Sequence, residues 1–294
     1  MRLRLNQPIV RSAVGLILLG IGGLALLPFG AQIRQAEMQA GLLTQYAHTG
    51  NKRDALMEQL SFFTLGGMRS LAAEILLLDA TTAWIERDWP RAERRWHAIT
   101  SLCPQRPNYW MSAARDMAVN AASHATHDDS LSPQMQTMLS RSYIERGVRF
   151  LLSGIAHQPD NPQLYAALGD IYADLNRRPD FTKAAEAYHA AVERGASPLY
   201  RRMEFYNLCR IRGREQEAWR LGRELFEAPG HRLPSVKCLL FVLENKLGLP
   251  AEDRLSVEEI FGSEQKARKE LTRFERNSLR FPIYGISSYL RAAE

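Results

Sequence analysis

Apolar residues recur three or four positions apart along most of the chain, which is the spacing of amphipathic α-helices. No stretch shows the period-two alternation of a half-buried β-strand. The sequence therefore predicts an all-α protein. The helices are expected at residues 31–47, 68–86, 91–102, 141–156, 198–212, 215–226 and 233–247, with shorter ones at 54–60, 256–261 and 263–276.

Two polar interruptions divide the pattern. The tripeptide Asp88-Trp89-Pro90 is expected to separate the first two long helices, because proline interrupts a helix. A further helix opens at Trp110 and pairs with residues 141–156, and the polar residues 123–136 between them are predicted as a loop. The apolar tail at residues 281–284 is predicted to pack back onto the helices.

One segment, residues 161–191, carries a recognisable repeat signature. It reads Tyr165-x2-Leu168-Gly169-x2-Tyr172, followed by Ala184-x3-Tyr188-x2-Ala191. This pattern resembles the tetratricopeptide repeat, a pair of antiparallel helices that stacks into a superhelix. The resemblance implies small residues where helices approach closely, aromatic residues that fill the gaps, and a solenoid that binds proteins or peptides.

A weaker copy of this signature precedes it, as Ala92-x3-Trp96-x2-Ile99. Pro104 and Pro159 lie 55 residues apart, which is one repeat of about 34 residues plus about 21 more. The expected structural positions of the repeats are Trp96, Trp110, Tyr165, Leu168, Gly169, Tyr172, Ala184 and Tyr188.

The run Phe62-Phe63-Thr64-Leu65-Gly66-Gly67-Met68-Arg69, with the tryptophan helices after it, also looks like a group of bacterial membrane-anchored repeat proteins. That resemblance covers roughly residues 60–195. It carries no catalytic or ligand-binding residue that could be transferred to this chain.

An uncharged apolar run at residues 13–31 predicts a membrane anchor. At about 1.5 Å per residue a helix of this length spans about 28 Å, close to the hydrocarbon core of roughly 30 Å. Arg2, Arg4 and Arg11 precede the run, so the N-terminus is expected in the cytoplasm and the remainder in the periplasm. A cleaved signal peptide is the alternative, although Phe29 stands where cleavage needs a small residue.

Composition fits a folded chain of this kind. Apolar residues make up 46% and charged residues 24%, with a modest net charge of +6. Cys103, Cys209 and Cys238 are far apart and form no Cys-x2-Cys motif, so we expect buried thiols, with one disulfide as the alternative.

The candidate partner-binding residues lie in an arginine-rich segment near residue 207. A cluster of guanidinium groups could bind an acidic peptide, a carboxylate or phosphate, or lipid headgroups. The competing interpretation is an ordinary solvated face. The candidates are Arg201, Arg202, Arg210, Arg212 and Arg214, with Arg220 and Arg223 nearby.

Catalytic motifs are absent from the sequence, which favours a protein that is not an enzyme and needs no cofactor. His124 and His127, followed by two aspartates, are the one cluster of metal-ligand residue types, and the polar context favours a loop without metal. The tryptophans from Trp84 to Trp110 could line a ligand groove, but their spacing favours packing between repeats.

Together these features predict four segments: an anchor at residues 1–31, a juxtamembrane segment at 32–64, tetratricopeptide-like repeats at 65–230 and capping helices at 231–294. The expected function is a scaffold that binds a protein partner in an envelope complex for secretion, transport or pilus assembly. The expected contacts are with protein and, through the anchor, with lipid, and not with nucleic acid. The alternatives are a structural subunit buried in a membrane assembly, with residues 281–290 as its apolar patch, and a metal-dependent enzyme or receptor that uses the histidine pair.

Overall fold

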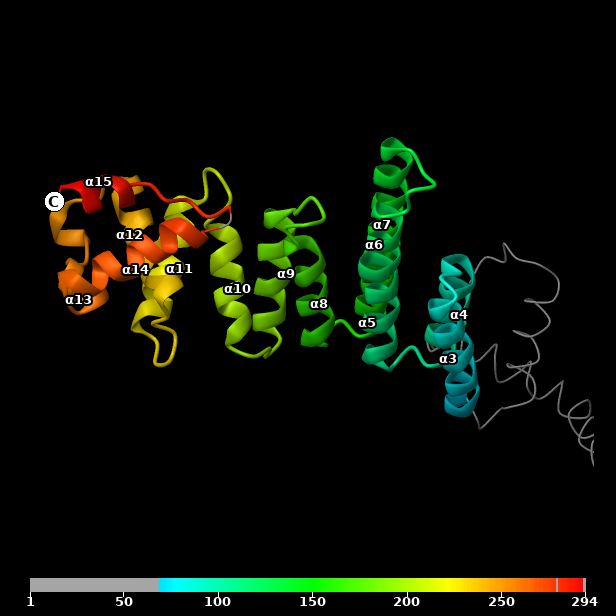
Figure 1. Cartoon of the computed structure of the whole chain (residues 1–294). Coiled ribbons are helices and arrows are strands. Elements are labelled where there is room, and N and C mark those ends of the chain that lie inside the picture. Colours follow the sequence, from blue (N-terminus) through cyan, green and yellow to red (C-terminus); the bar gives the residue numbers. More distant parts are fainter. Residues whose placement is uncertain (1–68, 279, 293–294) are drawn as a thin grey trace, which may run out of the picture. The chain divides into compact units, whose positions relative to one another are not determined.

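The computed structural model describes residues 69–278 and 280–292, and every element in these ranges is a helix (Figure 1). The predicted all-α class is confirmed. The proposed anchor at residues 13–31 and the juxtamembrane segment at 32–64 lie outside the described residues. Within the described ranges, none of the helices combines the length and the apolar character that crossing a bilayer requires.

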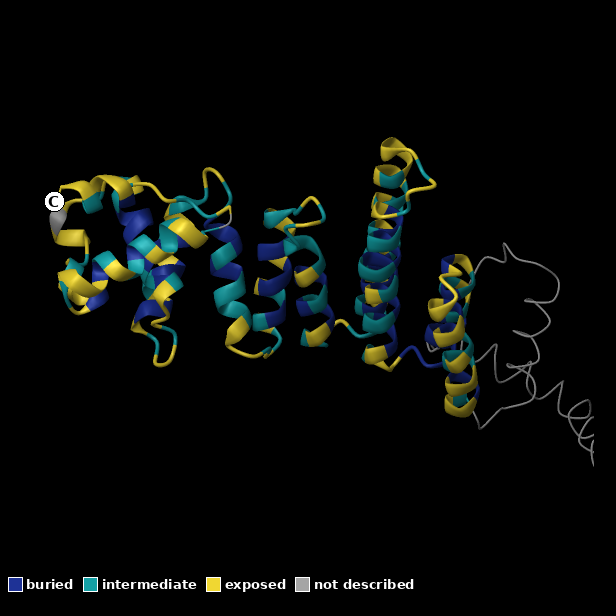
Figure 2. Ribbon diagram, in the orientation of Figure 1, coloured by how far each residue is buried: buried dark blue, intermediate teal, exposed yellow. Residues whose placement is uncertain are grey.

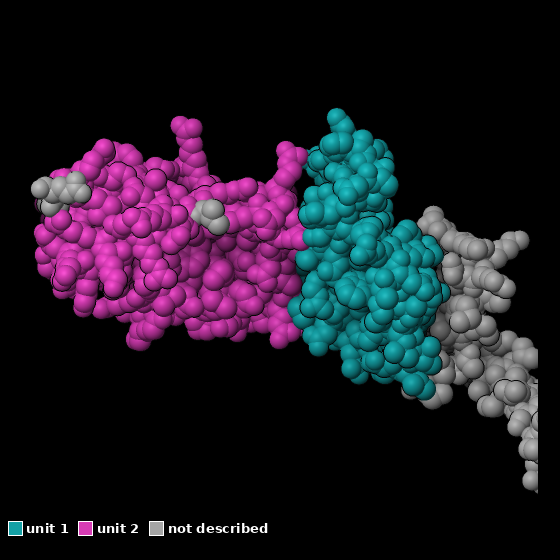
Figure 3. Space-filling model, viewed as in Figure 1, with its two compact units in different colours: residues 1–159 teal, residues 160–294 magenta. Residues whose placement is uncertain are grey.

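Two compact units make up the chain, with the boundary between Pro159 and Asp160 (Figure 3). This boundary falls inside the segment 65–230 that the sequence predicts as one run of repeats. Each unit is described separately below.

The first unit begins with a hairpin of α3 (Arg69–Ile85) and α4 (Trp89–Leu102), which pack against each other. The break expected at residues 88–90 lies two residues earlier, at 86–88. The carboxylate of Asp88 accepts a hydrogen bond from the Arg91 backbone N–H at 3.0 Å and so caps α4. Proline is tolerated in the first helical turn, where an N–H would have no partner, so α4 already includes Trp89 and Pro90.

The second hairpin of this unit is longer than predicted. Its first arm runs through α5 (Pro107–Arg115), the π-helical η1 (Asp116–Ala121) and α6 (Ala122–Thr126), and its second arm is α7 (Pro133–His157). The prediction of a loop over residues 123–136 is wrong at both ends, because only 127–132 lie outside a helix. The Ser132 hydroxyl accepts from the Met135 N–H and starts α7 early, so most of the extra residues lengthen the two helices.

In the second unit, helices pack against their neighbours in sequence. Contacts join α8 to α9, α9 to α10, α10 to α11 and α11 to α12. Their bounds are α8 (Pro162–Ala173), α9 (Phe181–Glu193), α10 (Leu199–Leu208), α11 (Glu215–Glu227) and α12 (Pro234–Leu247).

The C-terminal helices cover α12. They are α13 (Val257–Phe261), α14 (Glu264–Asn277) and α15 (Ile286–Arg291), with a 3₁₀ turn η2 (Ala251–Asp253) before them. The predicted return of the tail is confirmed, because the Phe281 ring lies 5.8 Å from that of Tyr206 and 5.9 Å from that of Phe274. The helix α15 was not expected.

Glycines allow an aromatic ring to approach a neighbouring helix closely at three places. A Cβ atom at Gly169 would lie 2.7 Å from the Tyr188 ring, and at Gly154 it would lie 2.7 Å from the Trp110 ring. At Gly222 it would lie 2.8 Å from the Phe205 ring. Each ring therefore occupies the space that a side chain would otherwise fill, as the repeat signature predicts for Gly169.

We predict that Gly169→Leu destabilises the second unit by about 1–3 kcal/mol or more, because the new side chain must displace the buried Tyr188 ring. Chemical denaturation of the purified chain measures this loss. Gln163→Leu, at an exposed position of the same helix, is the control and should unfold like the parent. Adding Tyr188→Ala to Gly169→Leu should restore part of the loss, and full additivity of the two changes would contradict the contact.

Candidate functional site

The five candidate arginines lie at the start of α10 and in the turn that leads to α11. The helix predicted to reach residue 212 ends at Leu208, so Arg210 and Arg212 belong to the turn. Arg214 occupies the N-cap position of α11. The five side chains consequently do not share one helical face.

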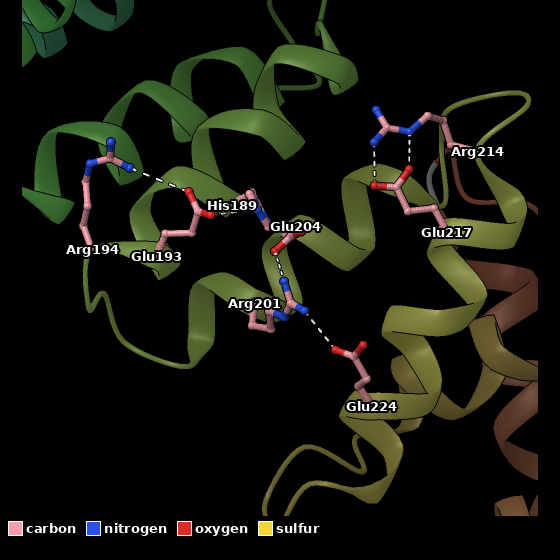
Figure 4. A network of polar contacts seen from close by, with 8 residues as sticks. All are labelled: His189, Glu193, Arg194, Arg201, Glu204, Arg214, Glu217 and Glu224. Carbon is pink, nitrogen blue, oxygen red and sulfur yellow. Dashed lines mark hydrogen bonds and ion pairs between the residues drawn. The ribbon is translucent and has the colours of Figure 1, made fainter.

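Arg201 joins α10 to two carboxylates (Figure 4). Its guanidinium donates to Glu204 at 3.0 Å and to Glu224 of α11 at 2.9 Å. Glu204 is buried, and its other oxygen lies 2.9 Å from Nδ1 of His189 on α9. Arg201 therefore compensates the buried charge of Glu204 and links α10 to α11. Its guanidinium already has two carboxylate partners within the fold.

Arg214 pairs with a carboxylate one helical turn away. Its Nη2 lies 2.5 Å from Glu217 Oε1, and its Nε approaches the second oxygen, so the pair is bidentate (Figure 4). The same pair holds the pKa of Arg214 above its usual value. Because the pair is largely exposed, it contributes little to stability, but it neutralises the charge locally.

Arg202 and Arg210 are half-buried. Arg202 Nη1 lies 3.3 Å from Nδ1 of His231. Arg210 donates to the Tyr206 carbonyl at 3.2 Å, and its guanidinium lies 3.7 Å from the centre of the Phe281 ring. Burial lowers the pKa of Arg210, although an arginine remains charged in this range. The returning tail thus covers Arg210 through a cation–π contact.

Arg212 and Arg220 are exposed, and neither forms an ion pair with any residue that the structure describes. Arg223 lies 3.5 Å from the buried Glu244. Most of the predicted cluster is therefore engaged in contacts within the fold. Binding of an acidic partner by these arginines stays a prediction, and Arg212 is the candidate best placed to make it.

The predicted repeat residues of the second unit lie at contacts between α8 and α9. The Tyr188 hydroxyl donates to Asp170 at 2.7 Å, and burial raises its pKa above the usual range. Arg194 lies 4.2 Å above the Tyr165 ring and Lys183 lies 5.5 Å from the Tyr172 ring. Leu168 and Ala184 are buried between the same helices.

The tryptophans of the first unit are mostly packing residues. Trp96 donates to Asp116 at 2.8 Å, and Trp110 donates to the Pro104 carbonyl at 2.9 Å. Both rings and that of Trp89 are buried, whereas Trp84 is exposed. This arrangement agrees with packing between helices and places three of the four rings away from solvent.

His124 lies in α6, which corrects the sequence interpretation of a loop, whereas His127 follows the helix in the turn. His124 Nδ1 accepts from Trp89 Nε1 at 3.3 Å, and His127 Nδ1 lies 2.8 Å from the Ser123 carbonyl. Within residues 69–278 and 280–292, no three histidine, cysteine or acidic side chains converge in a way that could hold a metal ion.

All three cysteines are buried and free, which confirms the expected scattered thiols. Burial raises the pKa of Cys238 to about 12 and that of Cys209 further. Since the thiolate is the reactive form, these residues are chemically quiet at neutral pH.

One surface was missed by the sequence interpretation. Leu71, Ile75, Leu78 and Ile85 of α3 are all exposed. Figure 2 shows exposed residues along the length of this helix. The sequence predicts residues 68–86 as one helix, and in the structure its buried residues are all alanines, whereas these four larger side chains remain outside. The sequence signal was available, because apolar residues occupy both sides of this helix.

No protein-family model matches the chain, and no curated protein matches it at a significant level.

We predict opposite outcomes for two neighbouring arginines. Arg201→Met should destabilise the chain by about 1–3 kcal/mol, because buried Glu204 loses its guanidinium partner while the apolar stem is retained. Arg212→Met should change stability by less than about 0.5 kcal/mol, as expected for an exposed residue. Equal denaturation midpoints for the two variants would show that the Arg201 contacts carry no stability.

His97 provides a prediction about pH. Its ring stacks on Phe150 at 4.4 Å, and burial together with Arg149 lowers its pKa from 6.5 to about 4. Glu93 lies 3.9 Å away but is itself engaged by Arg146 at 2.7 Å, so it does not offset the burial.

Because the folded pKa is depressed, the unfolded chain binds a proton first as the pH falls. The contribution of His97 to the free energy of unfolding is fully present above about pH 6.5. It should be lost progressively down to about pH 4, by about 1–3 kcal/mol. Denaturation of the parent and of His97→Gln across this range isolates the effect from carboxylate titration. Parallel stability curves for the two proteins would contradict it.

Proposed function

We propose that this protein is a membrane-anchored helical-repeat scaffold that binds a protein partner in a cell-envelope assembly. The observation that carries the proposal is the sequential packing of α8 through α12, in which each helix contacts the next one in sequence. Such quasi-one-dimensional stacks expose broad surfaces relative to their cores, and their common use is protein recognition.

The placement of the repeat residues supports the tetratricopeptide-like interpretation of the α8–α9 hairpin. Gly169 receives the Tyr188 ring from the second helix, and Ala184 of that helix is fully buried. A small residue facing an aromatic ring across a hairpin is what the signature in residues 161–191 implies.

The anchor and the orientation rest on the sequence alone. Residues 13–31 are long enough to cross a bilayer, and the arginines before them favour a cytoplasmic N-terminus. Display from a membrane would raise the effective concentration of the stack near partners in the same bilayer.

A structural subunit held permanently in a membrane assembly is the second candidate, and the exposed apolar side of α3 favours it. The tail proposed from the sequence as its apolar patch is largely used internally, because Phe281 and Ile286 pack in the fold. Ile283 and Tyr284 remain exposed there. The patch that such a subunit would use lies on α3 instead.

Site-specific photo-crosslinking in native membranes tests the scaffold. A photoreactive residue replaces, one at a time, Gln163, Glu186, Arg212 and Arg220, which are exposed positions on the second unit. Several of these positions should crosslink to the same partner protein, which would give adducts of equal mass. Arg141 on α7 of the first unit is the matched exposed position for comparison.

The absence of any adduct across the four positions would overturn the proposal of a partner for the second unit. Crosslinking that disappears at high salt and with Arg212→Glu would assign the contact to exposed charge. In the same cells, a reporter that is active only outside the cytoplasm, fused after Glu294, should be active, and activity confined to a cytoplasmic reporter would reverse the orientation.

A further inference from the structure

The outer side of α3 presents a row of large apolar side chains, with the polar Thr82 between Leu78 and Ile85. Leu71, Ile75, Leu78 and Ile85 are 51%, 58%, 71% and 68% exposed. The opposite side packs in the first unit through Ala72, Ala73, Ala80 and Ala83. The helix therefore has an inner side that is buried in the first unit and a second apolar side that no described residue covers.

The row has the spacing of a coiled-coil seam. Positions 71, 75, 78, 82 and 85 are separated alternately by four and three residues, which is a heptad repeat. In this frame Leu71, Leu78 and Ile85 occupy d positions, and Ile75 and Thr82 occupy a positions. A β-branched residue at a with leucine at d favours a parallel pair of helices over larger assemblies.

We propose that two copies of this chain pair in parallel through the α3 seam, defined as positions 71, 75, 78, 82 and 85. The parallel orientation rests on the proposed membrane anchor, because two chains inserted with the same topology present α3 in the same direction. A partner of this kind also explains why the apolar side lies on the first unit, nearest in sequence to the anchor.

The charges beside the seam are compatible with this pairing. In a parallel pair, a g residue faces the e residue five positions later in the other copy, so Glu74 faces Asp79. Asp79 is held by both Arg91 and Arg95, and Arg91 also pairs with Glu86, so the four charges at that site balance. The Glu74 carboxylate of one copy thus meets a balanced site on the other and not an uncompensated carboxylate.

The length of the seam argues for pairing on a surface. The helix has 17 residues, which is little more than two heptads and short for a stable coiled coil in free solution. Confinement of both copies to one bilayer makes the encounter effectively intramolecular and raises the local concentration. A short seam is sufficient under that condition.

Cysteine crosslinking of the full chain in membranes tests the arrangement. Leu71→Cys and Leu78→Cys are treated separately with a short thiol–thiol crosslinker. The three native cysteines are buried, so the parent supplies a low background. Each variant should crosslink to its own copy, because in a parallel pair position 71 faces 71 and position 78 faces 78. Glu145→Cys, exposed on α7, is the control and should remain uncrosslinked.

The orientation is tested by mixing Leu71→Cys with Ile85→Cys. Crosslinking only in the mixture would show antiparallel packing and would overturn the proposal. So would an intramolecular crosslink between Leu78→Cys and a cysteine placed at Leu56, since the seam would then be covered by the same chain. A monomer at natural membrane density, with no crosslinked species, would overturn it as well.

Disruption of the seam gives an independent measurement. Ile75→Lys combined with Leu78→Lys should lower the yield of crosslinked dimer at least tenfold. The melting temperature should stay near that of the parent, because both side chains are exposed. Retention of the dimer would contradict the seam. Extraction of membranes with alkaline carbonate tests the anchor separately. A chain that is extracted but still crosslinks at position 71 would contradict the anchored scaffold and support the α3 pair.

Discussion

Close contact between a glycine and an aromatic ring sets the spacing of the helices in both units. Gly154 receives Trp110 in the first unit, and Gly169 and Gly222 receive Tyr188 and Phe205 in the second. A ring that fills the place of a missing side chain brings the helix axes together and buries a large apolar area. The neighbouring alanines, such as Ala184 and Ala218, are buried because the helices are already this close.

This spacing also decides what the charged residues do. When α10 and α11 pack closely, a long arginine side chain of one helix can reach a carboxylate of the other, as Arg201 reaches Glu224. Arg214 pairs within α11, and Arg210 lies against Phe281 of the returning tail. An arginine-rich sequence that suggested a docking surface is thus largely part of the internal framework, since buried charges such as Glu204 require a partner.

Helices and their pairing could be predicted from local pattern, because capping residues and apolar spacing act within a few residues. Contacts with Glu204 and Phe281 could not, since they depend on side chains from distant positions. The extended hairpin of α6 and α7 was missed for a related reason: a polar segment reads as a loop, although Ser132 caps a helix within it. The exposed seam on α3 was hidden because apolar periodicity does not distinguish the packed side of a helix from the other.

The outer side of α3 carries leucine and isoleucine where a solvated helix would carry charged residues. Exposure of such a row to water is unfavourable in proportion to its apolar area. A complex that buries the row is therefore stabilised in proportion to the apolar area that it buries.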